Sequence, residues 1–486
     1  MTWKFKDLRE YISFLENKGD LRRITTPVST DLEITEITDR MVKQGGPALL
    51  FDHVEGNSMP VLINIFGTTQ RSAWALGVES LDELTARVRD LLGTVKEPHR
   101  GVIAKLRALG NLAHIASFHP KTIKKAPCQE IVVTGDDVDL STLPVLTCWP
   151  DDAGPFITLP LVISKDPITG VRNIGIYRMQ VYDRNTTGMH WQTHKVGAHH
   201  QRLAQEQRID RMEVAVALGA DPATMWAGSA PLPPDLDEYV LAGFIREEGI
   251  ELVKGVTVDL EVPAHAEIIL EGYVDPSESR LEGPFGDHTG YYSPAAEYPV
   301  FHVTAITRRK DPIYPTTMVG RPPTEDYFMG KASERLFLPG IQMMLPEVVD
   351  MNMPAEGAFH NLLIISIKKE YRGQAQKVVH GIWGMGLLAL SKTVVVVDAD
   401  VDVQNLSEVA WRVTNNLDPQ QDIFISSGPV DDLDHASVNL GFGSKVGVDA
   451  TSKGPLEGRL RDWPADIVMS DDVKALVNSK WEQYGI

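Results

Sequence analysis

Residues 282–292, EGPFGDHTGYY, bring two carboxylic acids, a histidine, two tyrosines and three glycines together in one short stretch. The glycines and the proline permit tight turns, so Glu282 and Asp287 need not be separated by the ~17 Å that five extended residues span. When two carboxyl groups face one pocket, their pKa values move apart, and one becomes a proton carrier while the other stays an anion. The spacing indicates proton-transfer chemistry, while an ordinary surface turn is the simpler explanation from these residues alone.

A second group that could do chemistry is the histidine-rich segment MHWQTHKVGAHH at residues 189–200. His190 and His194 would share one face of a helix, and with His199 and His200 they could bind zinc. The glutamate of the HExxH zinc motif is absent. A metal-dependent hydrolase or lyase that uses the His190-to-His200 cluster without a flavin is therefore the alternative hypothesis, and a cofactor loop or a plain surface segment is favoured over a zinc site.

Local sequence predicts helix-capping roles for several other acidic residues. In GADPAT, Asp221 is placed to cap a helix whose first residue is Pro222. In PPDLDEYVLAGFIREE, Asp235 can cap the next helix, and Glu238 then occupies the N3 position of a capping box. Capping is the role that local sequence favours for Glu238.

The elements that must position these residues fall into three regions. Residues 1–115 predict an α+β domain, in which an apolar helical stripe precedes the strand-like runs PALLF and MPVLINIF. Residues 116–310 contain repeated strand-like segments separated by Gly, Pro and Asp clusters, which predict a β-rich barrel or sandwich. Residues 311–486 alternate strand and helix patterns (NLLIISIKK, GQAQKVVHGIWGMGLL, TVVVVDAD), as an α/β domain does.

Composition narrows the class of protein. A chain of 486 residues exceeds what one hydrophobic core usually supports, so two or three domains are expected. The 66 acidic and 47 basic side chains give a net charge of −19, which repels phosphate backbones and argues against nucleic acid as a partner.

Targeting signals and cysteine usage predict a cytoplasmic protein. The amino terminus carries no export signal, and the most apolar stretch, residues 381–397, is interrupted by Ser391 and Lys392, so no transmembrane span is predicted. Cys128 and Cys148 stand in no metal-like spacing, which fits a reducing compartment.

Six segments, in this order, resemble one known family. They are NIGIYRMQ (173–180), GADPAT (219–224), PDLDEY (234–239), EGPFGDHTGYY (282–292), GRPP (320–323) and GSKVGVDAT (443–451). They are similar to the UbiD-type decarboxylases, which use prenylated flavin mononucleotide (FMN) and include the 3-polyprenyl-4-hydroxybenzoate carboxy-lyase of ubiquinone synthesis. The resemblance covers nearly the whole chain and implies a multidomain α+β fold with a split-barrel, cofactor-binding middle domain.

The resemblance implies a cofactor site built around a metal. Asn173 and Glu238 match the residues that bind divalent manganese at the cofactor phosphate, and relatives place a potassium ion beside it. Oxygen ligands suit Mn²⁺, and a buried phosphate needs cations to offset its charge. A histidine ligand of some relatives falls on Val196, with His194 and His199 as near alternatives.

The match also extends to the other cofactor contacts. The matching positions are Asn173, Ile176, Tyr177, Arg178, His190, Trp191, Gln192, Lys195, Val196, Glu238 and Lys392. For the phosphate, Lys445 is an alternative to Lys392, and a solvated lysine is almost as good an explanation of each.

The resemblance assigns Asp287 as the proton donor, with Glu282 and Arg178 completing a charged triad. Loss of CO₂ leaves an electron pair on an sp² carbon, for which no side chain is a competent sink, so a covalent adduct between substrate and modified flavin is implied. Arg178 is expected to keep Glu282 ionised, and that charge, with burial, to raise the pKa of Asp287. Asn173 and Arg178 have opposite parity in a strand and would point to opposite faces, so a bulge or bend at Gly175 is expected.

The implied reaction is a reversible, non-oxidative decarboxylation of an aromatic or α,β-unsaturated carboxylic acid. Simple hydroxybenzoates, vanillate-like acids and quinone precursors all remain open as substrates, and a prenylated substrate would bring peripheral contact with a membrane surface. The other implied partners are a flavin prenyltransferase that supplies the cofactor, and copies of the same chain in an oligomer between a dimer and a hexamer, with a carboxy-terminal helix for oligomerisation.

Overall fold

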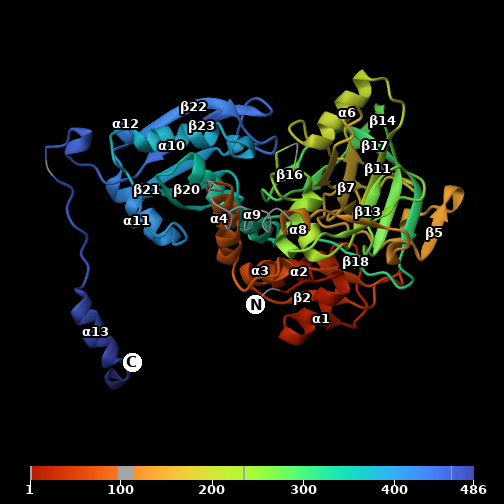
Figure 1. Ribbon diagram of the computed structural model, residues 1–486, viewed down its shortest axis with the longest axis horizontal. Helices are drawn as coiled ribbons and strands as arrows, with labels where there is room; N and C mark the ends of the chain where they lie inside the picture. The colour runs from red at the N-terminus through yellow and green to blue at the C-terminus, as the bar shows by residue number, and fades with distance from the viewer. Residues whose placement is uncertain (1–2, 97–113, 234–235, 461) are drawn as a thin grey trace, which may run out of the picture.

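A computed structural model describes the chain except for residues 1–2, 97–113, 234–235 and 461. An amino-terminal group of helices and strands packs beneath a central β-rich domain, and a carboxy-terminal α/β domain lies beside the central one (Figure 1). The long helix α9 (Glu325–Met344) runs between the central and carboxy-terminal domains (Figure 1).

The amino-terminal elements are α1 (Leu8–Lys18), β1 (Leu21–Ile24), α2 (Glu33–Lys43), β2 (Ala48–Phe51), β3 (Val61–Ile63), α3 (Thr69–Ala75) and α4 (Leu81–Lys96). Helix α1 forms because Leu8, Tyr11, Ile12 and Leu15 recur on one buried face, and Gly19 ends it in the left-handed conformation at φ 73°. The apolar runs PALLF and MPVLINIF form β2 and β3, as predicted. Strand β18 (Tyr314–Pro315) joins this sheet beside β3.

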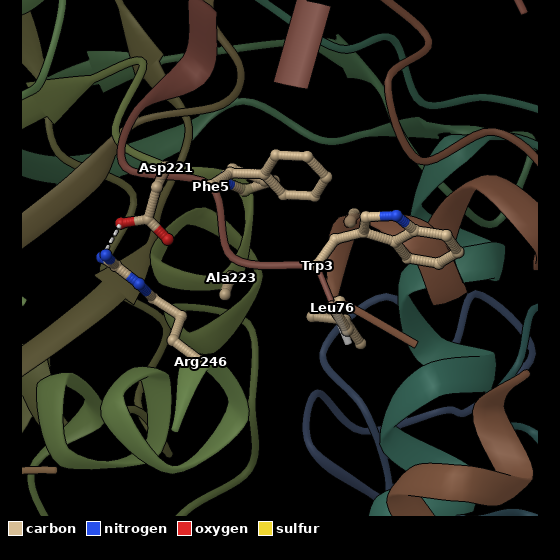
Figure 2. Close-up of a pocket in the computed structure, with 9 residues that line it drawn as sticks. Trp3, Phe5, Leu76, Asp221, Ala223 and Arg246 are labelled. Carbon is tan, nitrogen blue, oxygen red and sulfur yellow. Dashed lines mark hydrogen bonds and ion pairs between the residues drawn. The ribbon is translucent and has the colours of Figure 1, made fainter. Parts of the chain in front are cut away.

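The start of the chain packs against the central domain near helix α7 (Pro222–Ala227). Residues labelled in Figure 2 around a small pocket there are Trp3, Phe5, Leu76, Asp221, Ala223 and Arg246. Asp221 accepts a hydrogen bond from the backbone N–H of Thr224 at 3.1 Å and pairs with Arg246 at 3.0 Å (Figure 2). Asp221 therefore caps α7, with Pro222 as its first residue, and the predicted capping role is confirmed.

The central domain is rich in strands, as expected. Its elements are β4 (Lys121–Ile123), η1 (Pro127–Gln129), β5 (Ile131–Thr134), η2 (Gly135–Asp137), η3 (Leu140–Thr142), β6 (Phe156–Ile157), β7 (Leu161–Lys165), β8 (Arg172–Ile176), β9 (Met179–Gln180), β10 (Thr186–Gly188), α6 (Val196–Glu206), β11 (Met212–Leu218), α7, α8 (Glu238–Arg246), β12 (Glu251–Lys254), β13 (Glu261–Pro263), β14 (Ile268–Glu282), β15 (Phe285–Gly286), β16 (Tyr292–Ser293) and β17 (Ala296–Arg308).

The main central sheet has the order β10-β17-β14-β11-β7-β8, with β5 also paired to β17. Its neighbouring strands are antiparallel. Strands β10 and β8 stand at the two ends of this order and do not pair with each other, so the described part of the chain forms an open sheet here and not a closed barrel.

The carboxy-terminal domain is the predicted α/β layer. Its elements are α9, β19 (Val348–Asn352), η4 (Ala355–Gly357), β20 (Leu362–Ile367), α10 (Gln374–Trp383), η5 (Gly386–Leu390), β21 (Thr393–Asp398), α11 (Leu406–Asn416), α12 (Pro419–Asp422), β22 (Ile423–Pro429), β23 (Phe442–Asp449), η6 (Pro455–Glu457), α13 (Asp471–Ser479) and η7 (Trp481–Tyr484). Strands β20, β21 and β23 are parallel neighbours at the centre of the five-stranded sheet. The three quoted patterns form β20, α10 with η5, and β21, which confirms their prediction.

The last helix, α13, stands away from the rest of the carboxy-terminal domain at the end of an extended segment (Figure 1). None of its residues is buried. Across the described ranges, no helix combines the length and the apolar character needed to cross a lipid bilayer.

Candidate active site

Glu282, Asp287 and Arg178 lie together in the interior of the central domain. The Nε atom of Arg178 donates to Oε1 of Glu282 at 3.0 Å, and an amino group of the same guanidinium contacts Oδ2 of Asp287. The exposed fractions of the three side chains are 8% for Arg178, 0% for Glu282 and 8% for Asp287. Strand β14 ends at Glu282, and Asp287 begins the turn between β15 and β16. The turn-rich motif therefore folds two acids back onto one guanidinium.

Arg178 reaches this position without a bulge in β8. Each residue from Arg172 to Ile176 pairs in register with β7, so the bulge expected at Gly175 is wrong. Strand β8 ends at Ile176, and the next strand, β9, pairs with β6 in a separate sheet. Arg178 lies between the two strands, so the alternation of side chains along β8 does not determine its direction. Glycine is needed at 175 because a Cβ there would lie 2.4 Å from the ring of Tyr177.

Glu282 is held as an anion by two donors. Besides Arg178, Nδ1 of His190 lies 2.5 Å from Oε2 of Glu282, and the ring of His190 packs on Tyr298 at 4.2 Å. Burial opposes ionisation, but the hydrogen bond from His190 and the charge of Arg178 outweigh it and lower the pKa of Glu282. Burial in turn lowers the pKa of His190.

Asp287 differs from the sequence expectation. Burial opposes its ionisation, but the hydrogen bonds of His288 and the charge of Arg178 together lower the pKa of Asp287. The expected rise in that pKa is therefore wrong for this arrangement, because His288 bonds Asp287 and Arg178 contacts both carboxylates. A proton on Asp287 must come from a neighbour.

Two side chains to which the sequence analysis gave no role hold the motif in place. A carboxylate oxygen of Asp152 accepts the backbone N–H of Gly286 at 2.7 Å, and Oε1 of Gln180 accepts that of Gly283 at 2.9 Å. A Cβ at position 286 would lie 2.2 Å from the ring of Trp149, so only glycine fits there. The first part of the quoted stretch, residues 282–287, is thus a largely buried, hydrogen-bonded turn and not an ordinary surface turn, while residues 290–292 are exposed.

The predicted cofactor loop lies next to this triad. The backbone N–H of His190 donates to the carbonyl oxygen of Arg178 at 3.2 Å, and the ring of Trp191 packs edge-on to Tyr177 at 6.4 Å. Gln192 and Ile176 are half-buried near the same loop, whose chain continues into α6 at Val196.

The loop offers free donors that fit an anionic group. Nε1 of Trp191 is buried and makes no hydrogen bond within the described residues. Lys195 is half-buried, and desolvation lowers its pKa despite the opposing charge of Asp431. Lys195 also stands at the N-terminus of α6, where backbone N–H groups and the helix dipole favour an anion. These residues fit the phosphate of a flavin nucleotide.

Glu238 bonds the backbone of the residue that follows Asn173 in β8. One carboxylate oxygen of Glu238 accepts the backbone N–H of Ile174 at 3.0 Å, and Asn173 Nδ2 lies 3.4 Å from the hydroxyl of Tyr177. Burial raises the pKa of Glu238 to about 7. A buried carboxylate beside an amide oxygen is a donor set that suits a hard divalent cation such as Mn²⁺.

The capping-box interpretation of Glu238 is wrong. Asp237 is the N-cap of α8, and its carboxylate accepts the N–H of Tyr239 at 2.8 Å, which makes Glu238 the first helical residue. The predicted cap, Asp235, lies outside the described residues. Glu238 therefore points at β8, where its carboxylate accepts the N–H of Ile174.

The four histidines of the alternative hypothesis do not converge. His190 bonds Glu282, His200 bonds the hydroxyl of Ser164 at 2.9 Å, and His194 and His199 are exposed. In the part of the chain that the structure describes, no three His, Cys, Asp or Glu side chains are grouped closely enough to hold a metal. A metal at Asn173 and Glu238 would thus need further oxygen ligands from outside this set.

The two candidate lysines belong to the carboxy-terminal domain. Lys392 pairs with both carboxylate oxygens of Asp434, at 2.8 and 2.9 Å. Nζ of Lys445 donates to the backbone carbonyl oxygens of Ala389 and Pro429. The structure therefore shows neither lysine in contact with the cofactor loop.

Family models match this chain over most of its length. They describe the N-terminal, Rift-related and C-terminal domains of 3-octaprenyl-4-hydroxybenzoate carboxy-lyase, and they cover residues 12–89, 121–322 and 327–450 respectively. The chain belongs to the UbiD family. Membership makes it a decarboxylase, and a flavin-free hydrolase is not favoured.

Relatives of this UbiD-family enzyme align end to end with it. An uncharacterized protein of Archaeoglobus fulgidus is 52% identical over 480 residues, which cover 99% of this chain and 98% of the relative. Another, of Aquifex aeolicus, is 49% identical over 489 residues and 100% of both chains.

Two solved UbiD-type structures are also similar over their whole length. HmfF of Pelotomaculum thermopropionicum, in complex with FMN, is 30% identical with a TM-score of 0.80, covering 98% of this chain and 100% of that one. The vanillic acid decarboxylase of Sedimentibacter hydroxybenzoicus in closed form is 27% identical with a TM-score of 0.86, covering 99% of each chain. The open form of the same decarboxylase is 26% identical with a TM-score of 0.80.

The raised pKa of Glu238 makes stability depend on pH. A buried acid whose pKa is about 7 instead of 4.5 favours the fold while protonated, so its contribution is complete below pH 4.5 and is lost as the pH rises through 7. The difference corresponds to roughly 3 kcal/mol. In metal-free protein, Glu238→Gln should therefore unfold at higher urea concentration than wild type at pH 8 and at a similar concentration at pH 4.5.

Added Mn²⁺ should reverse this order at pH 8. The ion should raise the urea midpoint of the wild-type protein, because it stabilises the ionised carboxylate, and should leave Glu238→Gln unchanged. Equal urea midpoints of wild type and Glu238→Gln at pH 8 without metal would show that burial does not raise the pKa of Glu238.

Proposed function

We propose that this UbiD-family enzyme removes CO₂ from an aromatic, hydroxybenzoate-type, or α,β-unsaturated carboxylic acid with prenylated FMN, and that Asp287 protonates the carbon that loses CO₂. The observation that carries the proposal is the buried contact of one guanidinium with two carboxylates. The solved relatives support the cofactor and the substrate class, since HmfF has been solved with FMN and with prenylated FMN, and another is a vanillic acid decarboxylase.

The cofactor, when bound, supplies the electron sink for the pair of electrons that CO₂ leaves behind. Trp191 and Lys195, with the first N–H groups of α6, would hold its phosphate. Asn173 and Glu238 would hold Mn²⁺ at that phosphate, and a K⁺ ion beside it is part of the same proposal.

The triad divides the protein's work among three side chains. Glu282, with two donors on its carboxylate, stays ionised and fixes the guanidinium of Arg178. The guanidinium of Arg178 also stacks over the ring of Phe285 at 4.6 Å, and this contact keeps the guanidinium in one orientation. Asp287 would pass a proton from a neighbour to the substrate carbon, at a buried position that excludes most of the water.

The proposed partners follow from the same assignment. A flavin prenyltransferase would supply the cofactor, and the substrate would be a hydroxybenzoate, a vanillate-like acid or a ubiquinone precursor, the last with peripheral membrane contact. A homo-oligomer, from dimer to hexamer, is supported by exposed apolar side chains on the protruding tail. These are Ile467, Val468, Leu476 and Trp481.

The proposed function is tested by reconstitution. The chain should be co-expressed with a flavin prenyltransferase and purified, and CO₂ release should be followed over a panel of hydroxybenzoates, methoxybenzoates and unsaturated acids. A yellow protein that releases CO₂ from at least one acid of the panel is expected. A protein that carries the cofactor yet releases no CO₂ from any acid would refute the proposal.

A further inference from the structure

A hydrogen-bonded chain extends from Asp287 across the boundary between two domains. Nδ1 of His288 lies 2.9 Å from Oδ1 of Asp287, and Nε2 of His288 lies 2.8 Å from Nε2 of His360. His288 belongs to the turn before β16 in the central domain, and His360 lies between η4 and β20 in the carboxy-terminal domain. Strand β16 lies on the side of the central domain that faces the carboxy-terminal domain (Figure 1). The hydrogen-bonded series Asp287–His288–His360 therefore needs residues of both domains.

The geometry fixes where the protons lie in this chain. Two imidazole nitrogens 2.8 Å apart must share one proton, since two lone pairs or two N–H groups would repel each other. Burial opposes the charged form of His288, but the hydrogen bond to Asp287 outweighs it and raises the pKa of His288. Burial lowers the pKa of His360 to about 4, and the positive charge of His288 acts in the same direction. His288 is therefore the imidazolium that donates at both ends, and neutral His360 accepts.

Charged groups from every neighbouring element act on this pair. Asp326 on α9 and Asp431 after β22 face His288 with negative charge, and Lys195 and Asp431 face His360. The ring of Phe359 packs on His288 at 5.4 Å and orients it. The three carboxylates near His288 favour its charged form, and the hydrogen bond to His360 holds that form in line with Asp287.

We propose that His360 is a positioning residue of the decarboxylase, which the carboxy-terminal domain brings to His288 so that the Asp287–His288 pair holds the reaction's proton while the domains are together. The proposal rests on the proposed function and adds to it a source for the proton of Asp287. His360 acts through His288 and does not touch the reacting carbon.

The protons and electrons balance over one turnover. The carbon–carbon bond to the carboxylate breaks, CO₂ leaves, and the electron pair of that bond stays with the substrate carbon. The N–H bond at Nδ1 of His288 breaks as an O–H bond forms on Asp287, and that O–H bond breaks in turn as the new C–H bond forms. His288 ends as neutral imidazole, and one proton from solvent restores its charge before the next turnover.

Two substitutions of His360 separate this role from simple packing. In His360→Gln the amide oxygen can still accept from Nε2 of His288, whereas in His360→Phe no acceptor remains. With reconstituted enzyme, the alkaline limb of the kcat profile should move to lower pH by about one unit in His360→Phe, with kcat at pH 8 about tenfold lower and KM unchanged. His360→Gln should keep the wild-type profile.

A matched control comes from the same domain boundary. His435 also belongs to the carboxy-terminal domain and packs on Tyr291 of the central domain at 5.7 Å, but it is not bonded to the chain from Asp287. His435→Phe should leave the alkaline limb where it is. A shift of the same size in this variant, or a loss of kcat in His360→Phe that is equal at every pH, would assign His360 to packing and overturn the proposal.

A second measurement separates failure of this inference from failure of the proposed function. The ¹⁵N NMR titration of the His288 imidazole, assigned by comparison with His288→Asn, needs no turnover. The midpoint should lie above 6.5 in the wild type and in His360→Gln, and lower in His360→Phe. The same midpoint in all three proteins would refute the role of His360. If the midpoints differ as expected but the reconstituted enzyme releases no CO₂, the hydrogen-bonded series is supported and only the proposed decarboxylation is refuted.

Discussion

Asp287→Asn should lower kcat by about a thousandfold or more while the cofactor spectrum stays that of the wild type. General acid catalysis by a positioned group contributes 10²- to 10⁴-fold, and asparagine keeps the shape of the side chain and an oxygen for Arg178 but cannot carry the proton. Steady-state CO₂ release and the absorption spectrum of the purified flavoprotein are the two measurements. The reaction run in D₂O should also yield product deuterated at the former carboxyl position in the wild type.

A control for this variant lies a short distance away in the same domain. Asp151 is exposed and precedes Asp152, which holds the backbone of the motif. Asp151→Asn should keep wild-type kcat, since only its exposed carboxylate changes. Turnover of Asp287→Asn within a factor of three of wild type would show that Asp287 is not the proton donor. Among the described residues, Glu282 would then be the one other carboxylic acid in contact with Arg178.

Local periodicity was enough to predict the elements that need only their own residues. Helix α1 and strand β21 follow from the spacing of apolar side chains, and both are confirmed. Glu238 shows the limit of this approach. A glutamate three residues after an aspartate satisfies the capping-box pattern, yet Asp237 forms the cap, and a strand distant in sequence supplies the N–H of Ile174. Local sequence does not contain that partner.

The triad itself could be predicted only from the family motifs, and its electrostatics only in part, since Glu282 is ionised as expected but the pKa of Asp287 is lowered and not raised. Whether the pKa of Asp287 rises or falls depends on its bonds from His288 and on whether Arg178 bonds one carboxylate or both. The second of these is set by the end of β8 and the turn after β14. His288 lies inside the quoted stretch and could have been considered with its neighbour. His360 comes from another domain and from no motif, so only the folded chain brings it to His288.

Arg178→Met should destabilise the protein by about 3 to 5 kcal/mol at pH 8 and abolish turnover. Methionine has a similar length but no charge, so the variant leaves Glu282 and Asp287 buried at 0% and 8% exposure without their shared cation. Removal of one partner from a buried ion pair costs this much because the remaining charge is no longer compensated. Urea unfolding of the wild-type and variant proteins at pH 8 gives the difference.

The pH dependence of that loss identifies its cause. In the wild type the pKa values of Glu282 and Asp287 are lowered, so both acids stabilise the fold above their ordinary pKa values and lose this effect as the pH falls. Without Arg178, Glu282 keeps only the hydrogen bond of His190, so burial should raise its pKa, whereas His288 still bonds Asp287. The variant should therefore lose stability as the pH rises and Glu282 ionises. The difference between the two proteins should therefore be small at pH 4 and largest at pH 8.

Two further variants test whether uncompensated charge is the reason. Arg178→Met combined with Glu282→Gln removes one of the stranded carboxylates and should recover part of the stability at pH 8 without recovering activity. Arg280 on β14 pairs with Asp183 at 3.7 Å, with both side chains about half exposed, and Arg280→Met should cost less than about 1 kcal/mol. If Arg178→Met were as stable as Arg280→Met at pH 8, the guanidinium would not be what permits two acids to be buried together, and the assignment of Glu282 as a fixed anion would fail with it.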